Sequence, residues 1–132
     1  VLEHTPDEAE RVLREAIPHH WDPELVELYG RVVSTAPGRQ LTAAEGWVKA
    51  HPDDAILFLT LGRLCLQNER WAQAREHFEM SVRLAPTPAA QGELGRLCSA
   101  LGESRGTELL VAALAKNLPA LPLPPAGRRS DT

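Results

Sequence analysis

The sequence predicts an all-α protein built from stacked helical repeats, and three observations support this prediction. The five-residue phrase LGRLC occurs at 61–65 and again at 94–98, a spacing of 33 residues. Aromatic residues make up only 5% of the chain, whereas alanine and leucine, which favour helices, are common. Apolar residues recur every three or four positions, and no segment alternates in the way a strand does. Self-similarity at a period near 34 residues is typical of arrays of helix pairs.

Clear start signals place the helices along the chain. Thr5 and Glu8 form a capping box around Pro6 at the first helical position. Asp22-Pro23 and Thr87-Pro88 follow the same logic, because a side-chain oxygen accepts from free N–H groups and proline has no N–H to satisfy. The helices are therefore predicted at 6–17, 23–34, 40–50, 54–67, 71–84, 88–101 and 104–116. Their short connections make successive helices antiparallel.

Two helix starts are marked less sharply. Asp53 and Asp54 follow His51-Pro52, and they are placed to cap the helix predicted at 54–67. Thr42-Ala43-Ala44-Glu45 forms a possible capping box, although the helix around it can begin a turn earlier.

The periodic pattern stops near residue 117. The remaining stretch, NLPALPLPPAGRRSDT, carries four prolines and no period, which is typical of an extended chain. We therefore predict a helical repeat domain over 1–118 and a disordered proline-rich tail over 119–132, for which a docking motif is the alternative.

Composition and motifs argue against several function classes. The net charge is −4 and the pI is about 5.7, so no basic surface for nucleic acid is expected. The sequence has no glycine-rich phosphate loop and neither an HExxH nor a GxSxG motif, so we predict no catalysis, no metal and no cofactor. Cys65 and Cys98 occupy the same place in the repeated phrase and are expected to be buried free thiols.

The segment 55–86 closely resembles the tetratricopeptide repeat. Leu61-Gly62 lies in its first helix, Trp71 opens its second helix, and Ala74 and Phe78 follow at the expected offsets before Pro86. The resemblance implies a helix pair in which glycine permits close approach. The residues assigned to repeat packing are Gly30, Gly62, Gly95, Trp71, Ala74, Phe78 and Pro86.

Less regular copies flank this segment. Tyr29-Gly30 and Pro52 mark a copy over about 23–52, and Leu94-Gly95 marks another over about 88–118. The first copy puts Trp47 where a small residue is usual, and the last departs from the pattern at Thr107 and Val111. A partial repeat is expected at 5–18, so further repeats are expected before Val1.

A narrower resemblance covers residues 40–103, which look like the C-terminal part of HemY. HemY is a bacterial inner-membrane protein with tetratricopeptide repeats that is associated with late protohaem synthesis. The pieces that carry the resemblance are Ala44-Glu45-Gly46-Trp47, the His51–Asp54 turn and LTLGRLCLQNERWAQAREHFE.

This resemblance implies a protein-interaction scaffold that assists a late step of haem biosynthesis by organising partner enzymes. The chain would be a soluble domain of a bacterial inner-membrane protein whose N-terminal anchor lies outside this sequence. The side of the membrane stays open, and so does dimerisation of the fragment through an exposed terminal helix face.

An arginine follows each of the three packing glycines. Arg31, Arg63 and Arg96 are spaced by 32 and 33 residues, so stacked repeats align them roughly 10 Å apart. In the tetratricopeptide pattern this position faces the concave groove. We predict an anion-binding stripe for an acidic segment, a C-terminal carboxylate or a porphyrin propionate. The alternative is that each arginine pairs with a glutamate of a neighbouring helix, such as Glu24, Glu27 or Glu93.

Three apolar residues complete the predicted groove, although they can equally belong to the core: Ile56, Leu59 and Leu66. The rival function is direct binding of haem or a porphyrin, with the arginines on the propionates and His19 or His20 on the iron. His77 lies among charged neighbours and is expected to be solvated.

Overall fold

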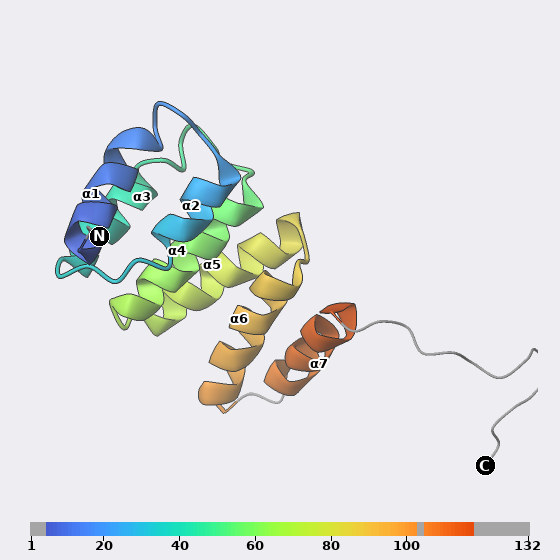
Figure 1. Cartoon of the computed structure of the whole chain (residues 1–132). Helices are drawn as coiled ribbons and strands as arrows, with labels where there is room; N and C mark the ends of the chain where they lie inside the picture. The colour runs from blue at the N-terminus through green and yellow to red at the C-terminus, as the bar shows by residue number, and fades with distance from the viewer. Residues whose placement is uncertain (1–4, 103–104, 118–132) are drawn as a thin grey trace, which may run out of the picture.

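The computed structural model describes residues 5–102 and 105–117, and these residues form seven α-helices and no strand (Figure 1). The helices are α1 (Pro6–Ala16), α2 (Pro23–Tyr29), α3 (Pro37–Glu45), α4 (Ala55–Gln67), α5 (Trp71–Leu84), α6 (Pro88–Ala100) and α7 (Arg105–Asn117). The predicted all-α class is confirmed. The predicted tail at 119–132 lies outside the described residues. Within the described ranges, no helix has the length and apolar character that a membrane crossing requires.

The predicted caps form at the starts of four helices. Thr5 and Glu8 make the reciprocal capping box of α1, with N···O distances of 3.1 and 3.0 Å. Asp22 caps α2, Asp54 caps α4 and Thr87 caps α6 through side-chain oxygens. Each such cap stabilises its helix by about 1 kcal/mol. The local sequence therefore determines where these four helices begin.

Helix α2 ends at Tyr29, so the predicted helix over 23–34 was too long. The side-chain amide of Gln40 donates to the carbonyl oxygens of Tyr29 and Val32, at 2.9 Å each. Gln67 of α4 also donates to the Val32 carbonyl at 3.1 Å. In a longer helix, backbone N–H groups would donate to these carbonyl oxygens. Here the side-chain amides donate to them instead, so the helix can end at Tyr29.

Helix α3 begins earlier than predicted, at Pro37, and ends at Glu45 rather than at residue 50. Proline suits the first helical position because its missing N–H needs no partner there. The proposed capping box at Thr42 is wrong, since the Thr42 hydroxyl lies inside the helix and donates to the Gly38 carbonyl at 3.0 Å.

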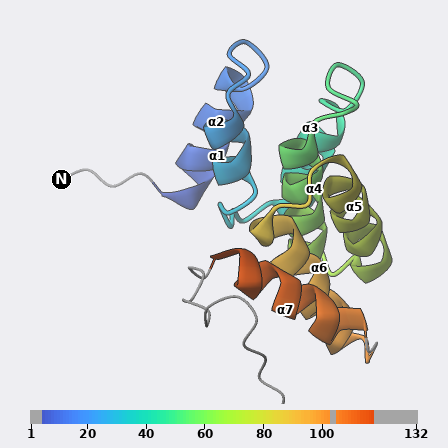
Figure 2. The ribbon, with the colours of Figure 1, turned by 90° about the vertical axis from the view of Figure 1, so that its right-hand side faces the viewer.

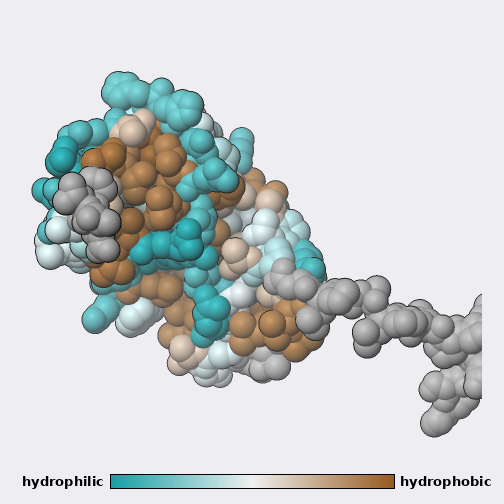
Figure 3. Space-filling model, viewed as in Figure 1, coloured by the Kyte–Doolittle hydropathy of each residue, from teal (hydrophilic) through white to brown (hydrophobic). Residues whose placement is uncertain are grey.

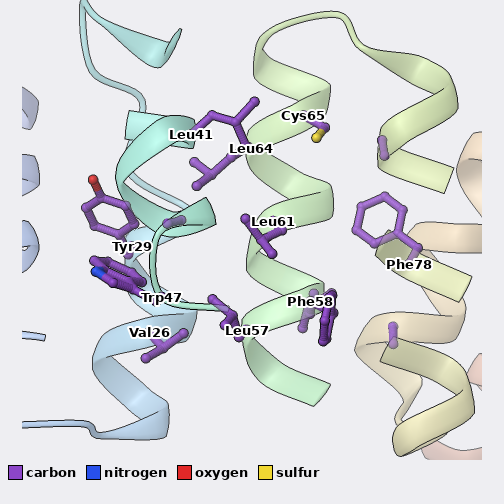
Figure 4. Packing of buried hydrophobic residues seen from close by; sticks show 14 of the residues in the cluster. Val26, Tyr29, Leu41, Trp47, Leu57, Phe58, Leu61, Leu64, Cys65 and Phe78 are labelled. Carbon is purple, nitrogen blue, oxygen red and sulfur yellow. The ribbon is translucent and has the colours of Figure 1, made fainter. Parts of the chain in front are cut away.

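Helix α4 is the centre of the core. It packs against α5 on one side and against α2 and α3 on the other. Figure 4 shows Leu57, Leu61 and Leu64 directed toward α2 and α3, while Phe58 and Cys65 face the side on which Phe78 lies. Full burial of one leucine side chain contributes about 1.5–3 kcal/mol. A helix that is apolar on both faces is therefore stable only when it is covered on both.

Glycine allows α4 and α5 to pack closely. A Cβ atom added to Gly62 would lie 2.3 Å from the Phe78 ring, so the ring occupies the space of the missing side chain. Gly30 lies against Thr60 in the same way, with a Cβ at 3.1 Å from the Thr60 backbone. Gly95 is buried in α6.

The other predicted packing residues differ in their burial. Ala74 and Phe78 are fully buried in the core between α4 and α5. Pro86 lies exposed between α5 and α6, and its carbonyl accepts a hydrogen bond from the Lys116 ammonium. Trp71 begins α5 and is substantially exposed.

The helices follow one another along a stack. Helices α1, α2 and α3 lie at one end, the α4–α5 pair lies in the middle, and the α6–α7 pair lies at the other end (Figures 1 and 2). Neighbouring pairs contact each other through α3 with α4 and through α5 with α6. Helix α4, which carries the predicted groove residues Ile56, Leu59, Arg63 and Leu66, packs against α2, and its Arg63 side chain reaches Glu93 of α6.

Candidate protein-binding surface on helices α2, α4 and α6

The three predicted arginines lie in one continuous chain of ion pairs. Arg31 pairs with Glu27 at 3.3 Å, and Glu27 pairs with Arg63 at 2.9 Å. Arg63 pairs with Glu93 at 2.7 Å, and Glu93 pairs with Arg96 at 2.6 Å. We call these five residues the ion-pair chain. It crosses from the end of α2 over α4 to α6.

The middle of the ion-pair chain is sheltered and its ends are open to solvent. The Arg63 and Glu93 side chains are 16% and 12% exposed, whereas those of Arg31 and Arg96 are 59% and 63% exposed. The Arg63 guanidinium contacts Glu27 of α2 through Nη1 and Glu93 of α6 through Nε. A planar guanidinium can make both contacts, whereas a lysine has a single side-chain nitrogen. The central arginine therefore ties α2 and α6 to α4.

Pairing with neighbouring glutamates, which the sequence left open, occurs at Glu27 and Glu93. Three guanidinium groups face two carboxylates, so the ion-pair chain carries one net positive charge. Arg31 and Arg96 each use one terminal nitrogen in these pairs, and a guanidinium has five N–H donors. The capacity to bind a further anion is therefore concentrated at the two exposed ends.

A hollow lies at each end of the ion-pair chain. One, of about 470 Å³, is lined by Pro23, Glu24, Glu27, Leu28, Arg31 and Ile56. The other, of about 420 Å³, is lined by Leu66, Trp71, Glu93, Arg96, Leu97, Ala100 and Leu101. Of the three apolar residues predicted for the groove, Ile56 and Leu66 thus line these hollows. Leu59 is buried in the core cluster.

The surface of this side of the molecule is divided between apolar and charged areas. Figure 3 shows apolar surface over α1 and α2 and again over α7, with hydrophilic side chains between them. The exposed apolar residues of these helices are Val12 and Leu28 in α1 and α2, and Val111 and Leu114 in α7. This face therefore offers both charged and apolar side chains for contact with a partner.

Sequence reasoning missed a buried carboxylate between α1 and α2. The Glu10 carboxylate is buried and accepts hydrogen bonds from the Tyr29 hydroxyl at 2.6 Å and from Arg14 at 2.8 Å. Arg39 of α3 lies 3.7 Å from it. Burial alone raises the pKa of Glu10, but the hydrogen bonds from Arg14 and Tyr29 outweigh burial and hold it below its ordinary value.

A sequence signal for this carboxylate did exist. Glu10 shares a helical face with Leu13 and Ile17, both of which are buried. A glutamate in the middle of an apolar face needs a partner inside the fold. The identity of that partner, Tyr29, depends on how α1 and α2 pack.

The histidines proposed for haem ligation lie away from both hollows. His19 and His20 are exposed in the turn after α1, and the His20 Nε2 atom lies 4.0 Å from the Asp22 carboxylate. His51 stacks on Trp21 with ring centroids 3.6 Å apart. In the described part of the chain, no three metal-ligating side chains gather.

Two further expectations concern buried side chains. His77 is not solvated as predicted: it lies half-buried near Phe58, and burial lowers its pKa. Cys65 and Cys98 are buried free thiols, as predicted. Burial raises the pKa of Cys65 to about 11, so its thiol stays protonated at neutral pH.

Comparison with known proteins identifies the fold. No protein-family model matches the chain, and no curated protein matches it in sequence. Among solved structures, MamA (41 to end) from Desulfovibrio magneticus RS-1 is similar, with a TM-score of 0.56 and 21% identity over 85% of each chain. A MamA RS-1 double mutant gives a TM-score of 0.49 and 18% identity over 85% of each chain. The first similarity shows that the chain has a tetratricopeptide-like fold.

Proposed function

From the tetratricopeptide-like fold, we propose that this chain is a non-catalytic scaffold that binds other proteins along a groove over α2, α4 and α6. The observation that carries the proposal is the ion-pair chain with a hollow at each end. Stacked helix pairs present such surfaces because each pair covers only its neighbours. Charged groups then lie beside apolar hollows, which is the usual composition of a protein interface.

The residues of the groove have distinct roles in this proposal. Arg31 and Arg96, at the exposed ends, bind carboxylates of the partner with the N–H donors that Glu27 and Glu93 leave unused. Arg63 is a positioning residue that holds α2, α4 and α6 in register. Ile56 and Leu66 provide apolar contacts in the two hollows.

The resemblance of residues 40–103 to HemY supports a narrower role. In that role the chain is part of a protein of the bacterial inner membrane, and its groove organises enzymes of a late step in protohaem biosynthesis. The support is the set of matching segments around Trp47, the His51–Asp54 turn and the repeat at 55–86.

The test is partner capture from detergent-solubilised bacterial membranes with the immobilised chain. The variant is Arg31→Glu with Arg96→Glu, which reverses both exposed ends and leaves Arg63 in place. The control is Arg11→Glu, an equally exposed arginine on α1 that pairs with Glu15. We expect the control to retain partners and the double variant to lose them, with circular dichroism unchanged in both.

Mass spectrometry of the captured proteins separates the general proposal from the narrower one. Haem-biosynthesis enzymes among the partners support the HemY-like role, and partners of other kinds support the scaffold alone. Equal capture of partners by the wild type and the double variant would contradict binding in the groove.

A parallel haem titration, followed by absorbance, tests the rival function of direct haem binding. A saturable shift of the Soret band that is lost on changing His19 and His20 would favour haem binding.

A further inference from the structure

A hollow of about 580 Å³ lies between the start of α4 and the turn that joins α5 to α6. Ala55 and Leu59 of α4 and Ala85 after α5 give it apolar walls. We call it the turn hollow. Of its described lining residues, only Ile56 also lines one of the two hollows of the groove. The turn hollow is therefore a separate candidate for a contact site.

Hydrogen bonds hold the walls of the turn hollow in place. The Ser81 hydroxyl of α5 donates to the Ala55 carbonyl at 2.8 Å, which ties α5 to the start of α4. Both oxygens of the Asp54 carboxylate accept hydrogen bonds, Oδ1 from backbone N–H groups of α4 and Oδ2 from the Trp21 indole at 2.8 Å. A segment that docks here therefore meets an ordered surface, which lowers the cost of binding.

The rim of the turn hollow is negative. Asp53 and Asp54 lie on it, and no lysine or arginine is among its described lining residues. Asp54 is engaged by the hydrogen bonds above. Asp53 is exposed, and its carboxylate makes no ion pair or hydrogen bond within residues 5–102 and 105–117. The Asp53 carboxylate is therefore available to a cationic group that lies beside the apolar walls.

The end of α7 brings the C-terminal segment of the chain to this hollow. The Lys116 ammonium donates to the Pro86 carbonyl, and the two neighbours of Pro86, Ala85 and Thr87, both line the turn hollow. Figure 1 shows α7 running back along α6, with its last turn toward the side on which α6 begins. The segment that follows Asn117 in sequence therefore starts next to the turn hollow.

The sequence of that segment, residues 118–132, matches both the walls and the rim, although it lies outside the described residues. It begins with LPALPLPP, in which prolines separate the leucines, and it continues to Arg128 and Arg129. An extended proline-rich chain covers about 3.1 Å per residue, so residues 118–125 can span about 25 Å, which exceeds the width of the hollow. Proline also restricts the unbound chain, so docking costs little conformational entropy.

We propose that residues 118–132 dock in the turn hollow of their own chain. Leu121 and Leu123 contact the apolar walls, and Arg128 or Arg129 pairs with the Asp53 carboxylate. A tethered segment has an effective concentration of roughly 1 mM, so contacts with a dissociation constant of roughly 0.1 mM keep it bound about nine-tenths of the time. This docking does not depend on the proposed groove.

Alkylation of a cysteine placed in the turn hollow tests the proposal in the full chain. Ala85→Cys puts a thiol in the wall, and Ala72→Cys puts a reference thiol on the exposed surface of α5. Mass spectrometry of peptides separates each new thiol from the two native buried thiols. We expect Arg128→Glu with Arg129→Glu to speed the reaction of Ala85→Cys about tenfold and to leave that of Ala72→Cys unchanged, because the segment no longer covers the hollow.

A charge swap identifies the contact. Asp53→Lys alone is expected to speed the reaction of Ala85→Cys by a similar factor. Asp53→Lys together with the two arginine changes is expected to restore the slow reaction, because opposite charges face each other again. Leu121→Asp with Leu123→Asp removes the apolar contacts and is expected to speed the reaction, with circular dichroism unchanged in every variant. Arg31→Glu, in the groove, leaves the rate unchanged and so separates a failure of this docking from a failure of the groove.

Three outcomes would overturn the proposal. The first is a reaction of Ala85→Cys that no change in residues 118–132 alters, because the hollow would then be open to a partner. The second is a charge swap that fails to restore the slow reaction. The third is protection of Ala85→Cys that rises with protein concentration, because the segment would then dock on a second copy of the chain.

Discussion

Single residues fix the polar contacts inside this helical stack. The Tyr29 hydroxyl donates to the buried Glu10 carboxylate at 2.6 Å, and Arg14 donates to the same carboxylate. Hydrogen bonds to a charged group are stronger than neutral ones, and a buried charge that loses a donor keeps its desolvation cost. The contact between α1 and α2 therefore depends on one hydroxyl group.

We expect Tyr29→Phe to lower the free energy of unfolding by about 1.5–3 kcal/mol, because the Glu10 carboxylate loses a donor without gaining water. Urea unfolding followed by circular dichroism measures the change. Thr35→Ala removes a hydroxyl that donates to the exposed Asp7 carboxylate, and it is expected to cost less. A smaller effect for Tyr29→Phe than for Thr35→Ala would contradict this account.

Glycine to alanine changes are expected to have opposite signs at two helical positions. Gly62→Ala forces a Cβ atom against the buried Phe78 ring, so we expect a loss of about 1–3 kcal/mol. Gly38→Ala, in α3, meets only Asn68 Oδ1 at 3.7 Å and is expected to stabilise by about 0.5–1 kcal/mol through helix propensity. Urea titrations of both variants give the two values, and equal effects would rule out close packing at Gly62.

The elements were predictable where their signals are local. The caps at Thr5, Asp22 and Thr87 come from neighbouring residues, and the starts of the helices that follow them were correctly predicted. The end of α2 was not predictable in the same way, because the amides of Gln40 and Gln67, distant in sequence, satisfy the carbonyls there. The periodicity of apolar residues in a sequence does not reveal helix ends that are set by tertiary hydrogen bonds.

The same distinction applies to the candidate groove. Repeat spacing predicted that Arg31, Arg63 and Arg96 would align, and the structure places them along one chain of contacts. Which glutamates they meet depends on the angle between helices, so Glu27 and Glu93 could only be offered as alternatives.

Arg63 is expected to matter for the contact between α2, α4 and α6. Arg63→Ala leaves the sheltered Glu93 carboxylate with Arg96 alone and Glu27 with Arg31 alone, so we expect a loss of about 1–2 kcal/mol after allowance for solvent screening. Arg31→Ala, at the exposed end, is expected to cost less than about 0.5 kcal/mol. Thermal and urea unfolding compare the two variants, and similar losses would contradict a central role for Arg63.

At the scale of the whole molecule, stability is expected to fall as the solution becomes acidic. The pKa of His77 lies below its ordinary value of 6.5 because burial disfavours the charged ring. The unfolded chain therefore binds more protons than the folded chain below about pH 6.5, and folding weakens there. The pKa of Glu10 also lies below its ordinary value of 4.5, so its contribution is present above that value and is lost as pH falls through its folded pKa.

The variant His77→Phe separates the contribution of His77 to the pH dependence of stability from that of Glu10. We expect the variant to lose the decline in unfolding free energy that begins below about pH 6.5 and to keep the decline below about pH 4.5. Urea unfolding at pH values from 7.5 to about 4 measures both. A wild-type profile that is flat between pH 7 and pH 5 would contradict the contribution of His77.

The two buried cysteines occupy equivalent places in adjacent helix pairs, Cys65 in α4 and Cys98 in α6. A buried thiol reacts with an alkylating reagent only when the structure around it opens. The alkylation rate of each cysteine therefore measures how often its own helix pair opens locally. Because stability in such stacks is close to a sum of neighbouring terms, the ratio of the two labelling rates reports whether the α6–α7 end opens before the centre of the chain.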